Sequence, residues 1–99
     1  MRVFVKSVLR DFWVKHNDSE LQLKAWYSDA EKALWKTPHD IKKYDSSVSI
    51  LSNNRAVFNI KGNDYRLIVE INYTRAWVFV KFIGTHKQYD RINAETIEP

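Results

Sequence analysis

Four side chains in the second half of the sequence have types that suit chemistry on an anionic group. Arg66 and Lys81 are cations inside apolar stretches, where a charge is costly to desolvate unless an anion lies close by. His86 can gain or lose a proton near neutral pH, and Tyr89 adds a phenol three residues later. With the amide of Asn59, these groups favour an anionic ligand over a plain hydrophobic core.

Each of these residues also has a structural interpretation. Arg66 could pair with Glu70 or with a neighbouring strand, and His86 could bond a local carbonyl at a helix start. If Arg66 and Lys81 lie side by side, they repel each other unless an anion such as phosphate bridges them. His16 and His39 have weaker contexts and are expected to be structural or solvated. The three histidines are not spaced as a metal site, so no metal and no cofactor are expected.

Three strand-like runs must position these groups, at residues 55–60, 65–72 and 76–83. The polar links 61–64 and 73–75 predict two hairpins. Alternation places the apolar side chains of the last two runs on one face, which we expect the helices to cover. That face comprises Tyr65, Leu67, Val69, Ile71, Val78, Val80 and Phe82. The other face carries Arg66 and Lys81 and should be covered by a ligand or a partner chain.

The first half of the chain predicts a short strand and two helices. Residues 2–5 form the strand, and Ser7 is expected to cap a helix that carries Leu9 on its apolar face. Ser19 and Gln22 predict a capping box for a second helix, which Thr37-Pro38 should end. The apolar stripe of that helix is Leu23, Trp26, Tyr27, Ala30, Ala33 and Leu34.

The remaining segments give weaker signals. Residues 39–44 could form a helical turn or a loop, residues 48–51 a short strand, and residues 52–54 a turn. Thr85 could cap a short C-terminal helix over residues 85–93, and the tail after it is expected to fray.

Length and composition set the broad class. With 99 residues and 44% hydrophobic content, the chain is expected to form one domain with one core. The net charge of +4 makes a polyanionic partner plausible. The absence of cysteine excludes a disulfide scaffold and a thiol nucleophile. No apolar run is long enough for a membrane helix, and the N-terminal residues lack the pattern of a signal peptide. We therefore expect a cytoplasmic protein with no membrane partner.

Two segments of the chain resemble a known family. Residues 58–67, FNIKGNDYRL, and residues 84–90, GTHKQYD, are similar to the two hallmark segments of HigB-type toxins, which are RelE-like toxins of type II toxin–antitoxin systems. The family pattern is roughly F-N-I-x-G-N-x-Y-R-L, then G-T-H-x-x-Y-D after one more strand. The resemblance implies an α+β fold and one toxin domain over residues 1–99. Its elements would be a strand, two helices, an antiparallel meander of three to four strands and a short C-terminal helix.

The resemblance also implies a function. Such a toxin would be a ribosome-dependent mRNA endoribonuclease, held inactive by a cognate HigA-like antitoxin, with DNA contacts only through that antitoxin. Cleavage would proceed by attack of a ribose 2′-OH on the adjacent phosphate without a metal ion. The implied catalytic residues are Arg66, Lys81, His86 and Tyr89, and the implied RNA-binding residues are Asn59, Lys61 and Lys87.

The resemblance and the chemistry of these side chains suggest a role for each implied catalytic residue. Arg66 and Lys81 suit the developing negative charge, and His86 suits acid or base catalysis. Tyr89 could stack on a base or assist a proton transfer.

Two other functions stay open at this stage. One is a toxin that inhibits a protein target such as gyrase without cleaving RNA, since the superfamily includes relatives of that kind and fold alone does not decide function. The other is a plain single-stranded RNA binder, which would need Trp77 and Phe79 exposed as stacking platforms. The cationic and imidazole groups favour the nuclease, because a simple binder gives them no acid–base task.

Overall fold

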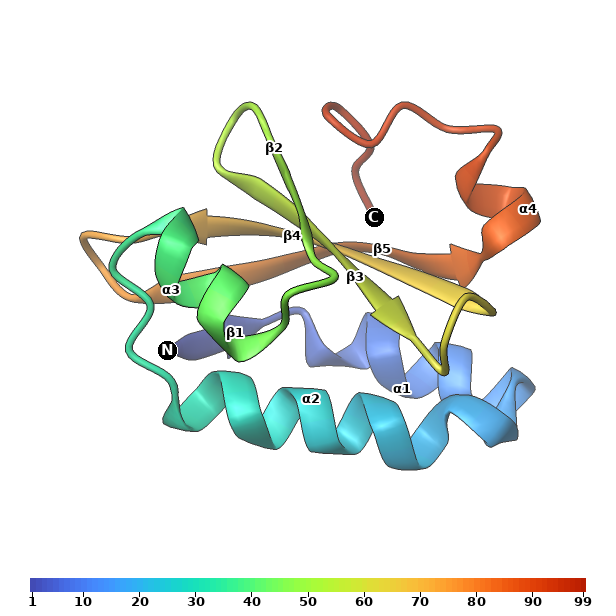
Figure 1. Cartoon of the computed structure of the whole chain (residues 1–99). Coiled ribbons are helices and arrows are strands. Elements are labelled where there is room, and N and C mark those ends of the chain that lie inside the picture. The colour runs from blue at the N-terminus through green and yellow to red at the C-terminus, as the bar shows by residue number, and fades with distance from the viewer.

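A five-stranded mixed sheet with two helices on one face forms the framework of the molecule (Figure 1). The computed structural model describes all residues, 1–99. Along the chain the elements are β1 (Arg2–Phe4), α1 (Lys6–Lys15), the 3₁₀ turn η1 (Asn17–Ser19), α2 (Glu20–Lys32), α3 (Pro38–Tyr44), β2 (Ser49–Leu51), β3 (Arg55–Ile60), β4 (Tyr65–Asn72), β5 (Trp77–Thr85) and α4 (His86–Tyr89). This order confirms the predicted α+β class.

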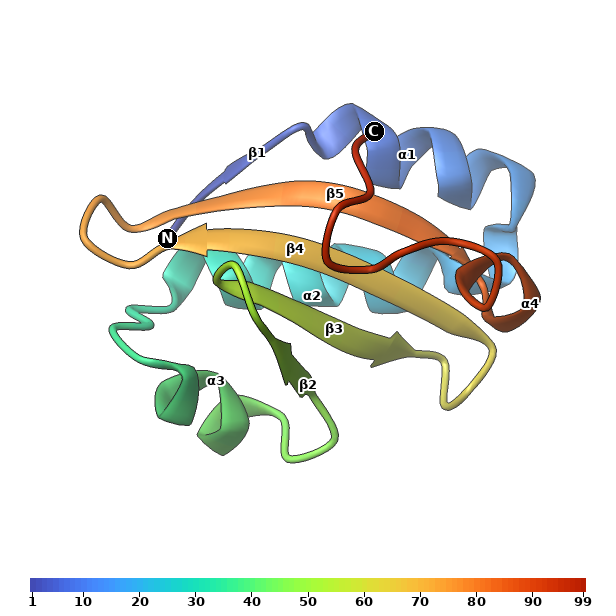
Figure 2. The same cartoon turned by 90° about the horizontal axis from the view of Figure 1, so that it is seen from above.

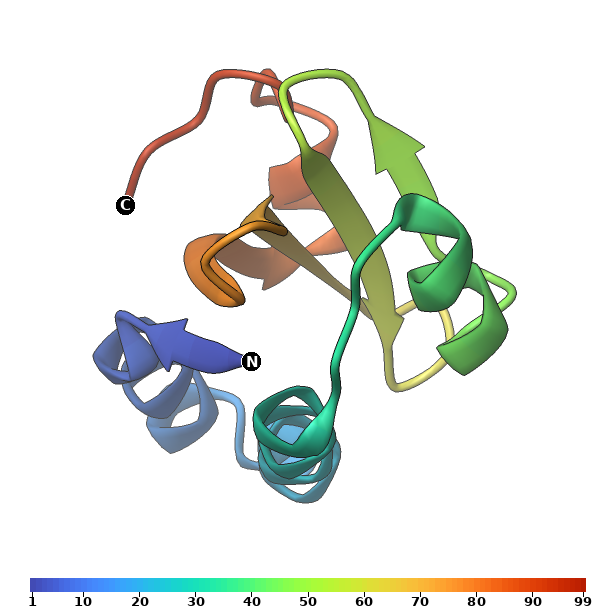
Figure 3. The same ribbon diagram turned by 90° about the vertical axis from the view of Figure 1, so that its left-hand side faces the viewer.

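The strands lie in the order β1-β5-β4-β3-β2. Strands β2 to β5 form the antiparallel part, and β1 joins β5 in parallel, with Arg2 paired to Trp77. Figure 3 shows the layers from the side, with α1 and α2 on one side of the sheet and the C-terminal segment on the other. No helix has both the length and the apolar composition needed to cross a membrane.

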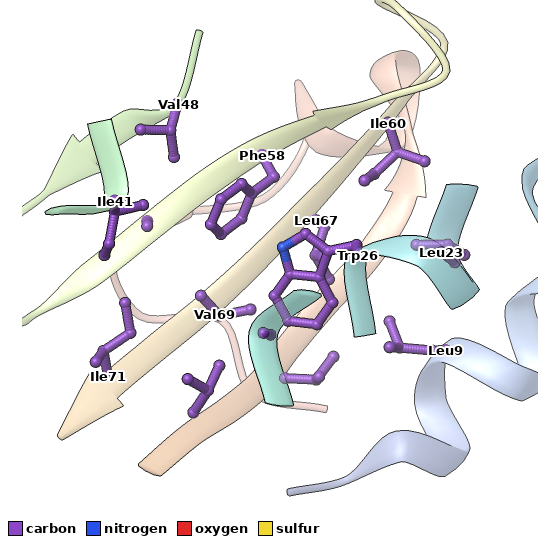
Figure 4. Close-up of a cluster of buried hydrophobic side chains, with 14 of the residues drawn as sticks. Leu9, Leu23, Trp26, Ile41, Val48, Phe58, Ile60, Leu67, Val69 and Ile71 are labelled. Carbon is purple, nitrogen blue, oxygen red and sulfur yellow. The ribbon is translucent and has the colours of Figure 1, made fainter. Parts of the chain in front are cut away.

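The hydrophobic core lies between the sheet and helices α1 and α2. Figure 4 shows Trp26 of α2 beside Phe58 of β3, and their ring centroids are 5.5 Å apart. Leu9 and Leu23 are fully buried below the sheet. The predicted apolar face of β4 is confirmed, since Tyr65, Leu67, Val69 and Ile71 all belong to this core.

A β-bulge at Lys81 changes the faces of β5. Val80 pairs with Val69 and Phe82 pairs with Ile68, so Lys81 has no partner on β4. The extra residue reverses the alternation beyond it. Phe82 therefore shares the face of Ile68, away from the helices, while Ile83 packs against the core. The sequence-based assignment of Phe82 to the core face is wrong for this reason.

The predicted side-chain caps do not form, although Ser19 does occupy the N-cap position of α2. Helix α1 begins after Val5, which has a positive φ of 68° and makes no side-chain cap, and Ser7 lies inside the helix. Ser19 Oγ donates to the His16 carbonyl at 2.6 Å. The Gln22 side chain accepts from the backbone N–H of Lys61, so neither side chain bonds the backbone at the start of α2 and the predicted capping box is absent.

Helix α2 ends at Lys32, and the segment after it differs from the prediction. Leu34 lies outside the helix and is 75% exposed, so it does not belong to the apolar stripe. Thr37-Pro38 starts a helix rather than ending one: Thr37 Oγ1 accepts from the backbone N–H of Asp40, and the Asp40 side chain accepts from that of Thr37. The segment after Pro38 is therefore helix α3, and β2 and the turn after it occur as predicted.

The C-terminal tail is docked on the sheet. Helix α4 ends at Tyr89, earlier than predicted, and the chain then crosses the face opposite α1 and α2 (Figure 2). Arg55 Nη1 donates to the carbonyls of Ala94 at 3.1 Å and Ile97 at 2.8 Å. The prediction of a frayed tail is wrong, because a buried side chain 39 or more residues away holds it.

Candidate active site

The candidate site lies at the end of the sheet where β4 begins and β5 ends. Register places Arg66 of β4 between Asn59 of β3 and Gly84 of β5. Helix α4 follows β5 directly and carries His86 and Tyr89. Four of the predicted residues, Asn59, Arg66, His86 and Tyr89, are thus brought to one end of the sheet.

Arg66 has no carboxylate partner. Its Nη1 donates to the carbonyls of Asn63 at 3.0 Å and Tyr65 at 3.3 Å. Glu70, the partner that the structural interpretation required, instead lies 3.1 Å from Arg55 Nε. The guanidinium of Arg66 is half-buried, is held by backbone carbonyls and keeps its charge available for an anion.

Tyr89 lies beside Arg66, with the guanidinium carbon 6.0 Å from the centre of the phenol ring. The ring also borders an open pocket lined by Leu51, Asp90 and residues 92–95. A half-buried ring next to a cation can stack on a base whose phosphate the cation holds.

Helix α4 is fixed at its start by a capping box. Thr85 Oγ1 accepts from the Gln88 N–H at 3.1 Å, and Gln88 Oε1 accepts from the Thr85 N–H at 2.9 Å. The backbone N–H of His86 also donates to the Asp64 carbonyl at 3.1 Å, which ties α4 to the β3–β4 turn. A Cβ at Gly84 would lie 2.5 Å from the Phe82 ring and 2.8 Å from Gln88 Oε1, so a larger residue there would displace the ring and the capping side chain.

His86 is oriented by a carboxylate that the sequence reasoning did not assign. Its Nδ1 lies 3.1 Å from Asp90 Oδ2. If Nδ1 carries the proton in this contact, Nε2 is left to exchange a proton with a substrate. His86 is 52% exposed, so a substrate can reach it. The spacing of four residues on a helix is the signal that could have identified Asp90.

Lys81 lies apart from this group. It comes three residues before Gly84, which is roughly 10 Å along the strand from the level of Arg66. Arg66 and Lys81 therefore do not lie side by side, and the cationic pair considered from the sequence is not formed. Lys81 Nζ instead lies 2.8 Å from Glu98 Oε1 of the C-terminal tail. The hydrogen bond from Lys81, with that from Arg55, holds the pKa of the Glu98 carboxyl below its usual range.

The two predicted RNA-binding lysines have different surroundings. Lys61 lies in the β3–β4 turn, and its Nζ is 2.7 Å from Oδ2 of Asp18 in η1. The hydrogen bond to this carboxylate raises the pKa of Lys61. Asp18 also accepts from the Tyr65 hydroxyl at 2.6 Å, so Lys61 helps to fasten this turn to η1. Lys87 is exposed on α4 and makes no ion pair.

The remaining histidines lie outside the candidate site. His16 stacks on Phe12 with ring centroids 4.3 Å apart, and His39 is exposed on α3. No group of three or more metal-ligating side chains occurs in the structure.

Asp18→Asn is expected to destabilise the protein at neutral pH, with an effect that fades in acid. The bonds from Lys61 and Tyr65 hold the pKa of Asp18 below its ordinary value of about 3.9. A depressed folded-state pKa stabilises the native state above that value, and this contribution is lost as the pH falls through the folded-state pKa. Urea denaturation at several pH values should show the two stability curves converging below about pH 3.9. Asp11→Asn is the control, and a gap that stays constant with pH would contradict the assignment.

A known protein family matches most of the chain. The family model described as HigB_toxin, the RelE-like toxic component of a toxin–antitoxin system, matches residues 19–92. This range includes the β3–β5 strands, α4 and the residues gathered at the site.

Curated relatives match over nearly the whole chain. The mRNA interferase toxin HigB of Escherichia coli (strain K12) is 24% identical over 96 residues, which cover 95% of this chain and 92% of the relative. The mRNA interferase HigB of Escherichia coli O6:H1 is 24% identical over 94 residues, with 93% and 91% covered.

Proposed function

Because the chain belongs to the HigB family of RelE-like toxins, we propose that it is an mRNA endoribonuclease that acts on translating ribosomes. The names of the relatives support RNA cleavage. The observation that carries the proposal is that one end of the sheet holds both Arg66, which has no carboxylate partner, and His86, which is oriented by a carboxylate.

The proposed reaction is attack of a ribose 2′-OH on the adjacent phosphate. A base removes the proton of the 2′-OH, an acid protonates the departing 5′-oxygen, and a cation stabilises the extra charge on the phosphorane. Arg66 supplies the cation. His86 supplies one proton-transfer group through Nε2, and the phenol of Tyr89 is available as the second or as a stacking surface.

The proposal includes partners. The toxin would be restrained by a HigA-like antitoxin and would contact DNA only through that protein. Its substrate would be mRNA on the ribosome, which places its action in the cytoplasm. Lys87 and Asn59 would contact the RNA backbone beside Arg66, and the pairing of Lys61 with Asp18 gives that lysine a structural task as well.

The plain RNA-binding alternative gains no support from the geometry. Phe79 is stacked on Phe4 with ring centroids 4.8 Å apart, and Trp77 packs edge-on against Phe4 at 5.6 Å. Phe4 therefore covers one face of the Phe79 ring, Arg75 lies over the Trp77 ring, and both rings lie toward the opposite end of β5 from Arg66.

Induced expression in bacteria with mapping of mRNA 5′ ends tests the proposal. We expect growth arrest with new 5′ ends inside translated messages, and none in a matched message whose start codon is removed. Arrest without mRNA cleavage but with loss of DNA supercoiling would support the gyrase-type alternative instead. Normal growth, with good yield of the chain alone, would contradict toxicity and the need for an antitoxin.

A further inference from the structure

One carboxylate of the tail bridges two cations on the face opposite the helices. Glu98 Oε2 lies 2.8 Å from Arg55 Nη2, and Glu98 Oε1 lies 2.8 Å from Lys81 Nζ. The cations come from β3 and β5, which flank β4 in the sheet. The Glu98 carboxylate therefore lies across β4 on the face that also carries Arg66.

The two cations are largely buried, whereas their carboxylate partner is largely exposed. The side chain of Arg55 is 4% exposed and that of Lys81 is 15% exposed, whereas that of Glu98 is 60% exposed. Arg55 is also held from within the sheet by Glu70, 3.1 Å from its Nε. The pair of cations is thus part of the framework, and its carboxylate partner comes from a terminal segment without regular structure.

The tail has few other anchors. Glu95 accepts from Ser52 Oγ, and Arg55 binds two tail carbonyls. In residues 93–99 only Ala94 and Ile97 are half-buried, and the rest are exposed. The polar anchors of the tail are thus the carboxylates of Glu95 and Glu98 and two backbone carbonyls, and a ligand that supplies equivalent oxygens can take the place of the Glu98 carboxylate.

We propose that Arg55 and Lys81 form a phosphate-binding site for the RNA backbone, and that the Glu98 carboxylate occupies this site in the free chain. Like a carboxylate, a phosphodiester presents two charged oxygens to an arginine fork and a lysine. The inference rests on the proposed function, because it takes RNA as the ligand.

The position of this second site fits a strand of RNA that runs along the sheet. Arg55 pairs with Glu70 of β4, and Glu70 comes four residues after Arg66 on the same strand. Arg55 therefore lies about 13 Å along the sheet from the level of Arg66. RNA held by Arg66 at the catalytic end would reach Arg55 and Lys81 with a neighbouring phosphate, and it would displace the tail there. Lys81 then binds the backbone rather than the phosphate being cleaved.

The test compares Glu98→Gln with Glu95→Gln. Both substitutions remove one negative charge from the tail, but only Glu98 contacts the two cations. Binding is measured by fluorescence anisotropy with a 2′-O-methyl single-stranded RNA, which cannot be cleaved. We expect Glu98→Gln to bind about fivefold more tightly than Glu95→Gln at low salt, the upper range for an exposed ion pair. Its salt dependence should be steeper by about 0.7, one phosphate contact on a single strand.

Lys81→Met in the Glu98→Gln chain should remove the gain, and circular dichroism checks the fold of each variant. Equal affinities of the two glutamine variants, or no binding by either, would overturn the inference. The result is separable from the proposed function, because binding uses uncleavable RNA. If the protein cleaves mRNA on ribosomes but the two glutamine variants bind RNA equally well, only the inference about the tail is contradicted. If Glu98→Gln binds RNA more tightly but the protein cleaves no mRNA, only the proposed nuclease function is contradicted.

Discussion

Arg66→Ala is expected to lower mRNA cleavage by about 10²–10³-fold, the usual cost of removing one preorganised group that stabilises transition-state charge. The fold should persist, because the guanidinium donates only to two nearby carbonyls and has no ion pair to lose. Its charge would be needed most when the phosphorane forms beside Tyr89.

In vitro cleavage on ribosomes measures this effect, with circular dichroism and thermal unfolding as checks of the fold. Arg75→Ala is the matched control, since it removes the same charge from the β4–β5 turn, where Arg75 only covers Trp77. Arg66→Lys should keep part of the activity, because a lysine restores the charge but not the fork of donors. A folded Arg66→Ala variant with wild-type activity would remove Arg66 from the mechanism.

His86→Ala is expected to lower cleavage by about 10²–10⁴-fold, the contribution of a positioned general acid or base. The capping box that Thr85 starts holds the helix that carries His86, and Asp90 orients the ring. The substitution leaves this capping box in place, so the loss should appear in activity and not in stability.

His39→Ala serves as the control for the histidine assignment, because His39 is exposed on α3 and has no place in the site. It should cleave at the wild-type rate in the same ribosome assay. Wild-type cleavage by a folded His86→Ala variant would shift proton transfer to Tyr89 or to a lysine.

The sequence allowed three strands of the sheet and the elements that carry the candidate site residues to be predicted, because their signals are local. The β-branched runs and polar turns define β3, β4 and β5, and the alternation on β4 gives the correct core face. The G-T-H-x-Q string encodes a cap, so the position of His86 at the start of α4 followed from neighbouring residues alone.

What could not be predicted depends on long-range contacts. The bulge at Lys81 appears only when β4 and β5 are aligned, and it decides the face of Phe82. Arg55 reaches Glu98 across 43 residues, so neither the docked tail nor a role for Arg55 has a local signal. Gln22 looked like a capping residue but is used by the β3–β4 turn.

The parallel pairing of β1 with β5 determines when the sheet can be completed during synthesis. Arg2 pairs with Trp77, so the first strand must wait until β5 has been made before it can join the sheet. Contacts of such large sequence separation form late and slow the folding reaction, because the loop-closure entropy must be lost before they add any stability. Helix α4, which carries His86, lies still further along the chain. A nascent chain therefore has no complete sheet until β5 has been made, and the residues of the candidate site come together only after α4 has followed it.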